Sequence, residues 1–163
     1  MKTTRTQLDL IKPSDFDEVL IMFNEPDTFK YIKHAQHKSR KEHIEFLQLK
    51  MTQTQSGIGY YWVIRELKTD KLIGAINLTP IPSTDEIQIG WIISRSFRKR
   101  GFAFEAAKAA LEFGINKTNF NPIYAVYEKD NIASEKIMEK LNFRLYKTFF
   151  EDEIELKKYK LDV

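Results

Sequence analysis

Cysteine is absent from this sequence of 163 residues. Disulfide bonds, thiolate metal sites and a cysteine nucleophile are therefore excluded. The sequence also lacks any run near the roughly 18 apolar residues that a membrane-spanning helix needs. No apolar stretch follows the polar residues 1–6 as it would in a signal peptide. We therefore expect a cytoplasmic protein that does not engage a membrane.

A large net charge of either sign is missing too, since 26 Lys and Arg against 23 Asp and Glu leave a net charge of +3. This value is too small to favour nucleic acid without a concentrated basic face, but it is compatible with a small polyanionic ligand. The chain is 42% hydrophobic and 30% charged, and it shows no repeat, linker or low-complexity segment. These properties predict one globular domain spanning residues 1–163.

Hydrophobic periodicity predicts a mixture of strands and helices. Strands are predicted at residues 5–11, 60–66, 72–78, 86–93, 122–127, 144–150 and 154–161. Helices are predicted after Ser14, after Pro26, from Ser39 to about Thr54, over residues 104–117, and after Asn131. Ser14 and Ser39 are candidate N-caps, and Glu42 completes a capping box with Ser39.

Residues 86–143 form the stretch around which the chain is organised. The predicted order there is strand, basic turn, helix, strand, helix. The basic turn places Arg98, Lys99, Arg100 and Gly101 directly before a helix. A helix N-terminus binds phosphate through its free backbone N–H groups and its dipole, and nearby cations add charge-assisted hydrogen bonds. The ordinary alternative is a solvated basic turn.

Three patterns in this stretch resemble the GNAT N-acetyltransferases, in particular their RimJ/RimL-like branch of ribosomal-protein N-terminal acetyltransferases. Residues 98–103, Arg-Lys-Arg-Gly-Phe-Ala, match the family's Gln/Arg-x-x-Gly-x-Gly/Ala at each defined position. Residues 88–92 resemble the branch's Glu-Ile-Gly-Tyr-Trp, and residues 131–134 and 140–143 resemble its Asn-x-x-Ser and Lys-x-Gly-Phe. The departures are Lys99 and Asn142 in place of glycine, and Gln88 in place of glutamate.

The resemblance implies the fold and the reaction. We expect an α+β fold, a single GNAT-like domain with a central, mixed but mostly antiparallel twisted sheet of about six to seven strands flanked by helices. The sheet should splay between its fourth and fifth strands, with acetyl-CoA in the splay. The acetyl group would pass directly to a primary amine, either a protein N-terminus or a small molecule. The resemblance does not distinguish a monomer from a homodimer.

The resemblance also implies two sets of cofactor-binding residues. The pyrophosphate would lie on the turn formed by Arg98, Lys99, Arg100, Gly101, Phe102 and Ala103. A Cβ at the glycine would obstruct the phosphate. Backbone N–H groups would hold the pantetheine arm at Trp91, Ile92 and Ile93. Asn131 would contact the pantetheine arm or cap the helix that it precedes.

Acetyl transfer needs a base for the ammonium and an acid for the departing thiolate. The resemblance makes Ser134 a candidate acid, with Tyr127 as the rival hydroxyl. Gln88 stands where the branch has its basic glutamate, but glutamine cannot accept a proton. Glu86 shares the strand face of Gln88 and could act through a water, unless the amine loses its proton to solvent. The ordinary alternatives are a surface position for Glu86 and a first-turn position for Ser134.

Two other classes of function stay open. A catalytically silent acyl-CoA-binding or regulatory module is favoured by Gln88, while a nucleic-acid-binding role for residues 97–102 is disfavoured by the acidic residues elsewhere. Analogy with the family suggests an acceptor cleft lined by Phe29, Tyr31 and Tyr60. His34 and His37 have the spacing of a helical metal pair but no third ligand in register, so no metal site is expected.

Overall fold

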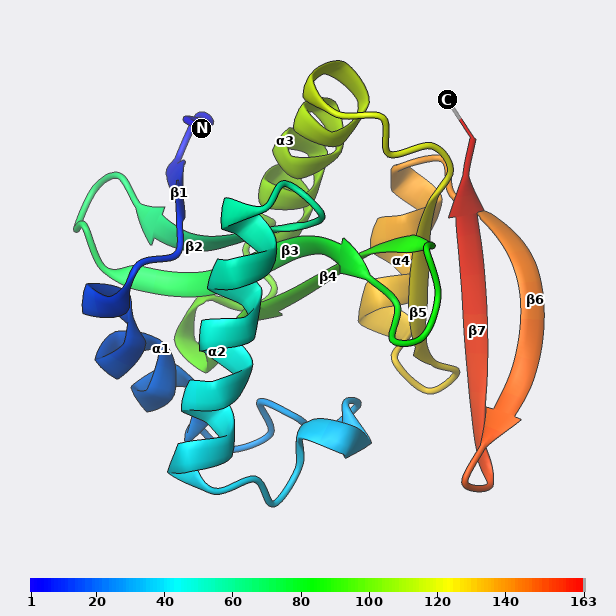
Figure 1. The fold of residues 1–163 in the computed structure, drawn as a ribbon, viewed down its shortest axis with the longest axis horizontal. Helices are drawn as coiled ribbons and strands as arrows, with labels where there is room; N and C mark the ends of the chain where they lie inside the picture. The colour runs from blue at the N-terminus through cyan, green and yellow to red at the C-terminus, as the bar shows by residue number, and fades with distance from the viewer. Residues whose placement is uncertain (163) are drawn as a thin grey trace.

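Seven strands form one sheet in the computed structural model, which describes residues 1–162. Their order across the sheet is β1-β2-β3-β4-β5-β7-β6 (Figure 1). The strands are Thr6–Leu10 (β1), Tyr60–Glu66 (β2), Leu72–Pro80 (β3), Ile87–Ile93 (β4), Ile123–Glu128 (β5), Arg144–Glu151 (β6) and Ile154–Leu161 (β7). The expected α+β fold with a mixed, mostly antiparallel sheet is confirmed.

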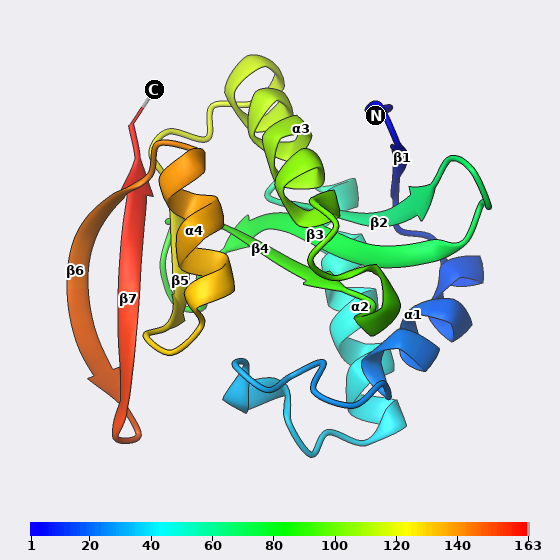
Figure 2. The same cartoon turned by 180° about the vertical axis from the view of Figure 1, so that it is seen from behind.

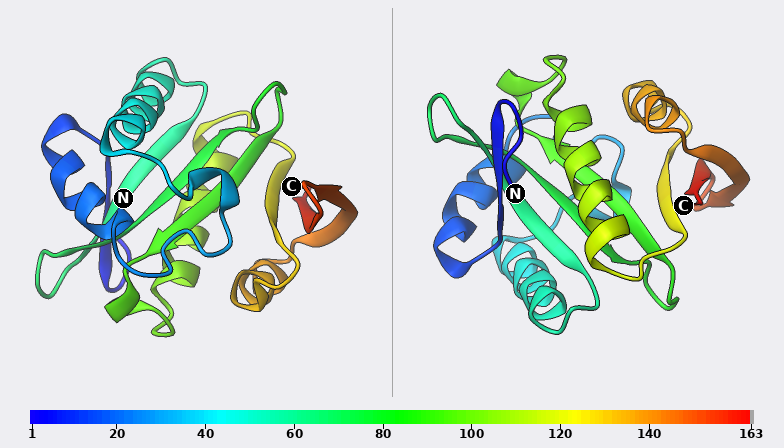
Figure 3. Two further views of the ribbon diagram at one scale, coloured as in Figure 1. Left: turned by 90° about the horizontal axis from the view of Figure 1, so that it is seen from below. Right: turned by 90° about the horizontal axis from the view of Figure 1, so that it is seen from above.

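Four α-helices cover the two faces of the sheet. They are Phe16–Phe23 (α1), Arg40–Gln55 (α2), Phe102–Lys117 (α3) and Ile132–Lys140 (α4). Helices α1 and α2 lie on one face, and α3 and α4 on the other (Figures 1, 2 and 3). The chain connecting α1 to α2 passes across the first of these faces near β4 (Figure 3, left).

The splay lies between β4 and β5, as expected. These strands are parallel and pair only at Ile87↔Ile123 and Gln88↔Tyr124. Beyond those two pairs they diverge (Figure 2), while β4 stays paired with β3 and β5 with β7. Within residues 1–162, the facing edges of β4 and β5 therefore carry backbone groups that no strand covers.

Each face of the sheet has its own hydrophobic core. The core under α1 and α2 includes Val19, Leu47 and Val63, and the core under α3 and α4 includes Ile76, Ile123 and Met138. Helix α3 presents small side chains to the sheet, and the exposed fraction of Ala106, Ala107 and Ala110 is 0%. At Gly114 an added Cβ would stand 2.8 Å from Leu78 Cδ1. Small residues therefore let α3 lie close to the sheet.

Several local predictions are confirmed. The Ser39 hydroxyl accepts a hydrogen bond from the Glu42 N–H, and the Glu42 carboxylate accepts one from the Ser39 N–H at 2.7 Å, which completes the capping box of α2. Asn142 has a φ of 63°, and asparagine tolerates this left-handed conformation after a helix. Its replacement of the branch's glycine therefore preserves the turn into β6.

Two predicted helix starts are wrong. Ser14 does not cap α1, because Pro13–Asp15 forms a 3₁₀ turn and α1 begins at Phe16. The Asp15 carboxylate secures this turn by accepting a hydrogen bond from the Lys12 N–H at 3.1 Å. No helix follows Pro26, where the chain has only turns before the 3₁₀ segment Lys33–Ala35. Asp27 takes a φ of 63°, which is incompatible with a continuing right-handed helix.

Replacing Ala110 with Leu should lower the free energy of unfolding by about 1–3 kcal/mol, because the larger side chain overpacks the contact between α3 and the sheet. Urea denaturation measures this difference. The matched control is Lys108→Leu, which adds the same side chain at an exposed position of α3 and should leave stability nearly unchanged. Equal effects of the two substitutions would contradict the close packing of α3.

Candidate active site

The turn between β4 and α3 is built to present backbone N–H groups. Lys99 has a φ of 58° and Gly101 a φ of 83°, and both values are left-handed. Glu105 is the first residue of α3 whose N–H donates a backbone hydrogen bond. It donates to the Gly101 carbonyl at 3.1 Å. The N–H groups of residues 99–104 make no hydrogen bond to any residue in the described part of the chain. Such a run at a helix N-terminus is a site for an anion.

Lys99 stands where the RimJ/RimL-like branch has a glycine, and it keeps the left-handed backbone conformation that glycine favours. A left-handed φ costs a non-glycine residue roughly 1–2 kcal/mol, so the surrounding turn must stabilise it. The exposed Lys99 side chain has no ion-pair partner among residues 1–162. Its ammonium is therefore available to a ligand on the turn.

The two arginines of the turn are held by protein groups. Arg98 Nε donates to the Ile93 carbonyl at 2.9 Å, which ties the turn to the end of β4. The Arg100 guanidinium lies 5.1 Å from the Phe97 ring centroid and 5.2 Å from that of Phe102. Arg100 also pairs with Glu66 at 3.7 Å. Both arginines therefore stabilise the conformation of the turn.

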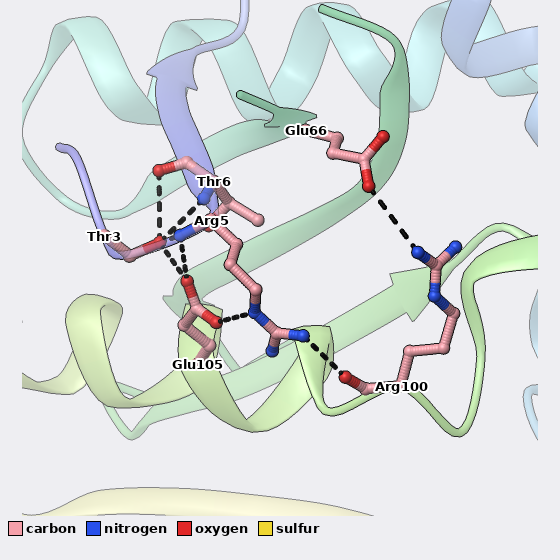
Figure 4. Close-up of polar contacts among 6 residues, drawn as sticks. All are labelled: Thr3, Arg5, Thr6, Glu66, Arg100 and Glu105. Atoms are coloured by element: carbon pink, nitrogen blue, oxygen red, sulfur yellow. Dashed lines mark hydrogen bonds and ion pairs between the residues drawn. The ribbon is translucent and has the colours of Figure 1, made fainter. Parts of the chain in front are cut away.

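A second network joins the N-terminal strand to the turn (Figure 4). Arg5 Nε pairs with Glu105 Oε2 at 2.8 Å, and Arg5 Nη1 donates to the Arg100 carbonyl at 2.9 Å. The Thr3 hydroxyl and the Arg5 N–H donate to the other Glu105 oxygen. Burial alone would raise the pKa of Glu105, but these hydrogen bonds and the Arg5 charge outweigh it and hold the pKa below 4.5.

The α1–α2 connection is fastened to the end of β4 through Glu25. Its carboxylate accepts from the Ser94 hydroxyl at 2.6 Å and from the Arg95 N–H at 2.6 Å. Ser94 and Arg95 begin the short 3₁₀ turn Arg95–Phe97, which leads into the turn at residues 98–103. Glu25 thereby positions both the connection and the start of that turn.

The β5 side of the splay carries the hydroxyl candidates. Asn131 Oδ1 accepts from the Ser134 N–H at 3.2 Å, so Asn131 caps α4. Tyr127 is 7% exposed. Its ring centroid lies 5.3 Å from that of Tyr159, and within residues 1–162 its hydroxyl makes no hydrogen bond of normal geometry. Burial raises the pKa of Tyr127. Because β4 and β5 are parallel, Asn131 and Ser134 follow the same end of β5 as the turn at residues 98–103 follows of β4, and Tyr127 lies near that end of β5.

Side chains on β4 divide between the two faces of the sheet. Ile93 belongs to the core under α3, and Trp91 packs against that core. Ile92 packs against the core under α1 and α2. What this part of β4 offers the splay is therefore its backbone edge.

Gln88 and Glu86 lie at the closed end of the splay. Gln88 pairs in register with Thr79 of β3 and Tyr124 of β5, and cross-strand partners share a face. Glu86 directly precedes β4 and forms an ion pair with Lys158 of β7, whose exposed fraction is 5%. The Lys158 ammonium also stands 4.1 Å from the Tyr124 ring centroid. Glu86 is therefore the counter-ion of a buried lysine.

An open groove of about 1110 Å³ begins beside this closed end. Its walls come from α2, the β3–β4 turn and the segment before β5, and they include Lys50, Asp85, Glu86, Phe120, Pro122 and Tyr124. Lys50, Lys158 and Tyr124 were not identified from the sequence. Lysines on a polar helix and on a terminal strand give no local signal, because only tertiary packing buries them.

The predicted acceptor cleft is partly wrong. Tyr60 stacks on Trp62 and packs edge-on against Phe113 of α3, on the sheet face opposite α2. Phe29 belongs to the ring cluster with Phe23 and His43. Alternation along β2 sends Tyr61 to the α2 face and Tyr60 to the α3 face.

His34 and His37 do not share a helix, since His34 lies in the 3₁₀ segment and His37 has a φ of 58°. Within residues 1–162, no group of three His, Asp or Glu side chains is arranged to hold a metal ion. The same residues include no helix with the length and apolarity to cross a bilayer.

A family model described as "Acetyltransferase (GNAT) domain" matches residues 5–144. The chain therefore belongs to the GNAT acetyltransferase family, and the predicted resemblance to N-acetyltransferases is confirmed.

Known relatives cover most of the chain. Uncharacterised protein YkkB of Bacillus subtilis (strain 168) is 27% identical over 132 residues, which are 78% of this chain and 74% of YkkB. Uncharacterised N-acetyltransferase p20 of Bacillus licheniformis is 24% identical over 143 residues, which are 87% of this chain and 80% of p20. The solved structure of RimL, a ribosomal L7/L12 alpha-N-protein acetyltransferase in complex with coenzyme A, has a TM-score of 0.86 at 15% identity and covers 99% of this chain and 96% of RimL. That likeness shows a common fold.

Replacing Glu105 with Gln should make the free energy of unfolding depend less on pH in the acidic range. The folded pKa of Glu105 lies below its ordinary value of 4.5, so the carboxylate stabilises the fold above that value and loses this contribution as pH falls through the folded pKa. Urea denaturation between pH 7 and pH 3 should show that Glu105→Gln has a lower free energy of unfolding than the wild type. This difference should shrink as pH falls. A pH-independent deficit would argue against the network, and exposed Glu112→Gln is the matched control.

Glu86→Gln should lower the free energy of unfolding by about 1–3 kcal/mol, because it leaves the buried Lys158 ammonium without its counter-charge. The double variant Glu86→Gln with Lys158→Met should recover most of this loss, since both partners are then neutral. Chemical denaturation of the single and double variants measures both effects. If the double variant is no more stable than Glu86→Gln alone, Glu86 does not act as the counter-ion.

Proposed function

We propose that this protein transfers the acetyl group of acetyl-CoA directly to a primary amine. The observation that carries the proposal is the run of unbonded N–H groups at residues 99–104, directly after the strand that borders the splay. A coenzyme A pyrophosphate is a dianion that suits such a turn. The exposed Lys99 ammonium adds a charge-assisted contact, and Gly101 lets the phosphate approach the backbone.

The remaining cofactor contacts would come from the splay. The uncovered β4 edge at Trp91, Ile92 and Ile93 offers backbone N–H and carbonyl groups, and the pantetheine arm carries amides that pair with such groups. Arg98, Arg100, Phe102 and Ala103 would shape the turn, and Asn131 would fix α4 on the other side. Acetyl-CoA supplies the activated acyl group, and the protein supplies position and proton transfer.

The acceptor would enter the groove beside Gln88, on the α1–α2 face of the sheet. Its ammonium must lose a proton before its nitrogen can attack, and the departing thiolate must gain one. Ser134 and Tyr127 are the candidate donors to the thiolate. The Tyr127 hydroxyl favours that role because it is buried and makes no hydrogen bond of normal geometry within residues 1–162. Its raised pKa keeps it protonated.

Two classes of acceptor fit this chemistry. RimL is named for a protein α-amine, and another structural neighbour with a TM-score of 0.79 is named a spermidine N-acetyltransferase. We propose a protein N-terminus or a small-molecule amine for this chain, of the RimJ/RimL type. We propose further that residues 1–163 act as one catalytic unit in the cytoplasm, as a monomer or homodimer, without a nucleic-acid or membrane partner.

The proposal is tested first by binding. Gly101→Val should weaken coenzyme A binding at least tenfold by isothermal titration calorimetry, because a Cβ obstructs the turn and a left-handed φ disfavours valine. The matched control is Gly57→Val, since Gly57 is also left-handed, with a φ of 74°, but lies in a loop outside the turn. Unchanged affinity in folded Gly101→Val would contradict this binding site.

Turnover is tested with acetyl-CoA and a panel of α-amino peptides, polyamines and small primary amines. Thiol release that depends on the amine, together with an acetylated product by mass spectrometry, is expected for at least one class. Tight coenzyme A binding with no turnover across the panel would favour a catalytically silent module instead.

A further inference from the structure

Lys50 of α2 places an amine without a counter-ion on the wall of the groove. Its Nζ donates to Thr79 Oγ1 at 3.0 Å and to Gln53 Oε1 at 3.3 Å. No carboxylate within residues 1–162 forms an ion pair with it. It also lies 5.3 Å from the centroid of the Phe46 ring. Lysine is rarely buried without a counter-ion, so the position of this half-buried amine on the groove wall calls for a functional explanation.

The position of Lys50 is set by a chain of side-chain hydrogen bonds across the sheet. The Thr79 hydroxyl donates to Asn77 Oδ1 at 3.0 Å, and Asn77 Nδ2 donates to the Gly90 carbonyl of β4 at 3.2 Å. Because the single Thr79 hydrogen is committed to Asn77, the Thr79 oxygen must accept from Lys50. The register pairs Thr79 with Gln88, so the lysine nitrogen lies over the sheet beside the position where the resembling branch has its glutamate.

The hydrogen bonds of the Lys50 amine are compatible with a neutral amine that acts as a base. A neutral lysine amine has two hydrogens and one lone pair. Thr79 and Gln53 provide one acceptor for each hydrogen, which leaves the lone pair for a donor in the groove. We propose that Lys50 accepts the proton of the incoming ammonium, a role that Gln88 cannot perform. This inference rests on the proposed acetyl transfer and assigns the base for it.

The proton-transfer step is balanced within the groove. The acceptor R–NH₃⁺ and neutral Lys50 become R–NH₂ and the Lys50 ammonium. The freed lone pair of the acceptor nitrogen then attacks the acyl carbon, and Lys50 returns its proton to water through the open groove. No oxidant, metal or covalent enzyme intermediate is needed.

The electrostatics of the groove support this assignment. Burial lowers the pKa of Lys50 from 10.5 to about 8, so a substantial neutral fraction exists near pH 8. The charged or titratable groups that face it across the groove are Asp85 and Glu86 of the β3–β4 turn and Tyr124 of β5. Glu86 is already committed to buried Lys158. Its carboxylate is the counter-ion of that ammonium, whereas Lys50 has no counter-ion within residues 1–162.

The experiment compares pH profiles of kcat/KM for the wild type, Lys50→Met, Lys50→Arg and the control Lys41→Met, which removes an exposed lysine of the same helix. The wild-type rate should rise with pH through an apparent pKa of about 8. In both Lys50 variants the rate at pH 8 should fall by roughly 10²–10⁴, as is typical of a lost general base. Their rising limb should move to the pKa of the acceptor amine.

Two measurements separate this role from a structural one. Lys50→Met should keep or raise the melting temperature, because it removes a half-buried amine that has no counter-ion, whereas a structural lysine would lower it on removal. NMR titration of ¹³Cε-labelled lysine, with the resonance assigned by its loss in Lys50→Arg, should show a midpoint about two pH units below that of ordinary lysine.

Three results would overturn the inference. An ordinary lysine midpoint near 10.4 or an unchanged pH profile in an active Lys50→Met enzyme would remove Lys50 from the proton transfer while leaving the proposed acetyl transfer intact. A wild-type protein that acetylates no amine at any pH would overturn both proposals, and the NMR midpoint would then report only the burial of Lys50.

Discussion

The rest of the structure depends on one constraint, which is that β4 and β5 pair over only a short length. Two residue pairs hold these parallel strands together, and each strand then finds its remaining hydrogen bonds on its other edge, with β3 or β7. The sheet stays continuous while two backbone edges face an open wedge. Because the strands are parallel, α3 and α4 both follow the open end. The cofactor-binding candidates and the candidate acids Tyr127 and Ser134 come from distant parts of the sequence and lie near that end for this reason.

Some charged side chains around the splay bond to other protein groups and stabilise the site, while others stay available to a ligand. Arg98 and Arg100 bond to β4, to aromatic rings and to Glu66, and Arg5 locks the turn through Glu105. What is left for an anion is mainly the backbone N–H groups and Lys99. At the closed end, Glu86 neutralises Lys158, so Lys50 is left without a counter-ion.

Local chemistry was predictable wherever the residues that decide it are neighbours in the chain. The capping box at Ser39, the left-handed Asn142 and the strand bounds of β2 and β7 follow from short patterns of this kind. The predicted start of α1 failed because Asp15 bonds to the Lys12 N–H and pairs with distant Arg65 at 3.0 Å. Tyr60 was assigned to an acceptor cleft, but the alternation of β2 turns it toward α3.

By itself, the sequence determined the GNAT family, the order of the main elements and the basic, glycine-containing turn before α3, since these depend on contiguous motifs. Only the tertiary structure decided which side chains surround the proposed acceptor groove. Lys50, Thr79, Gln88 and Tyr124 come from four separate elements, and their proximity follows from strand register and helix packing. Burial and the lack of a counter-ion at Lys50 are properties of that packing, so no local sequence pattern could reveal them.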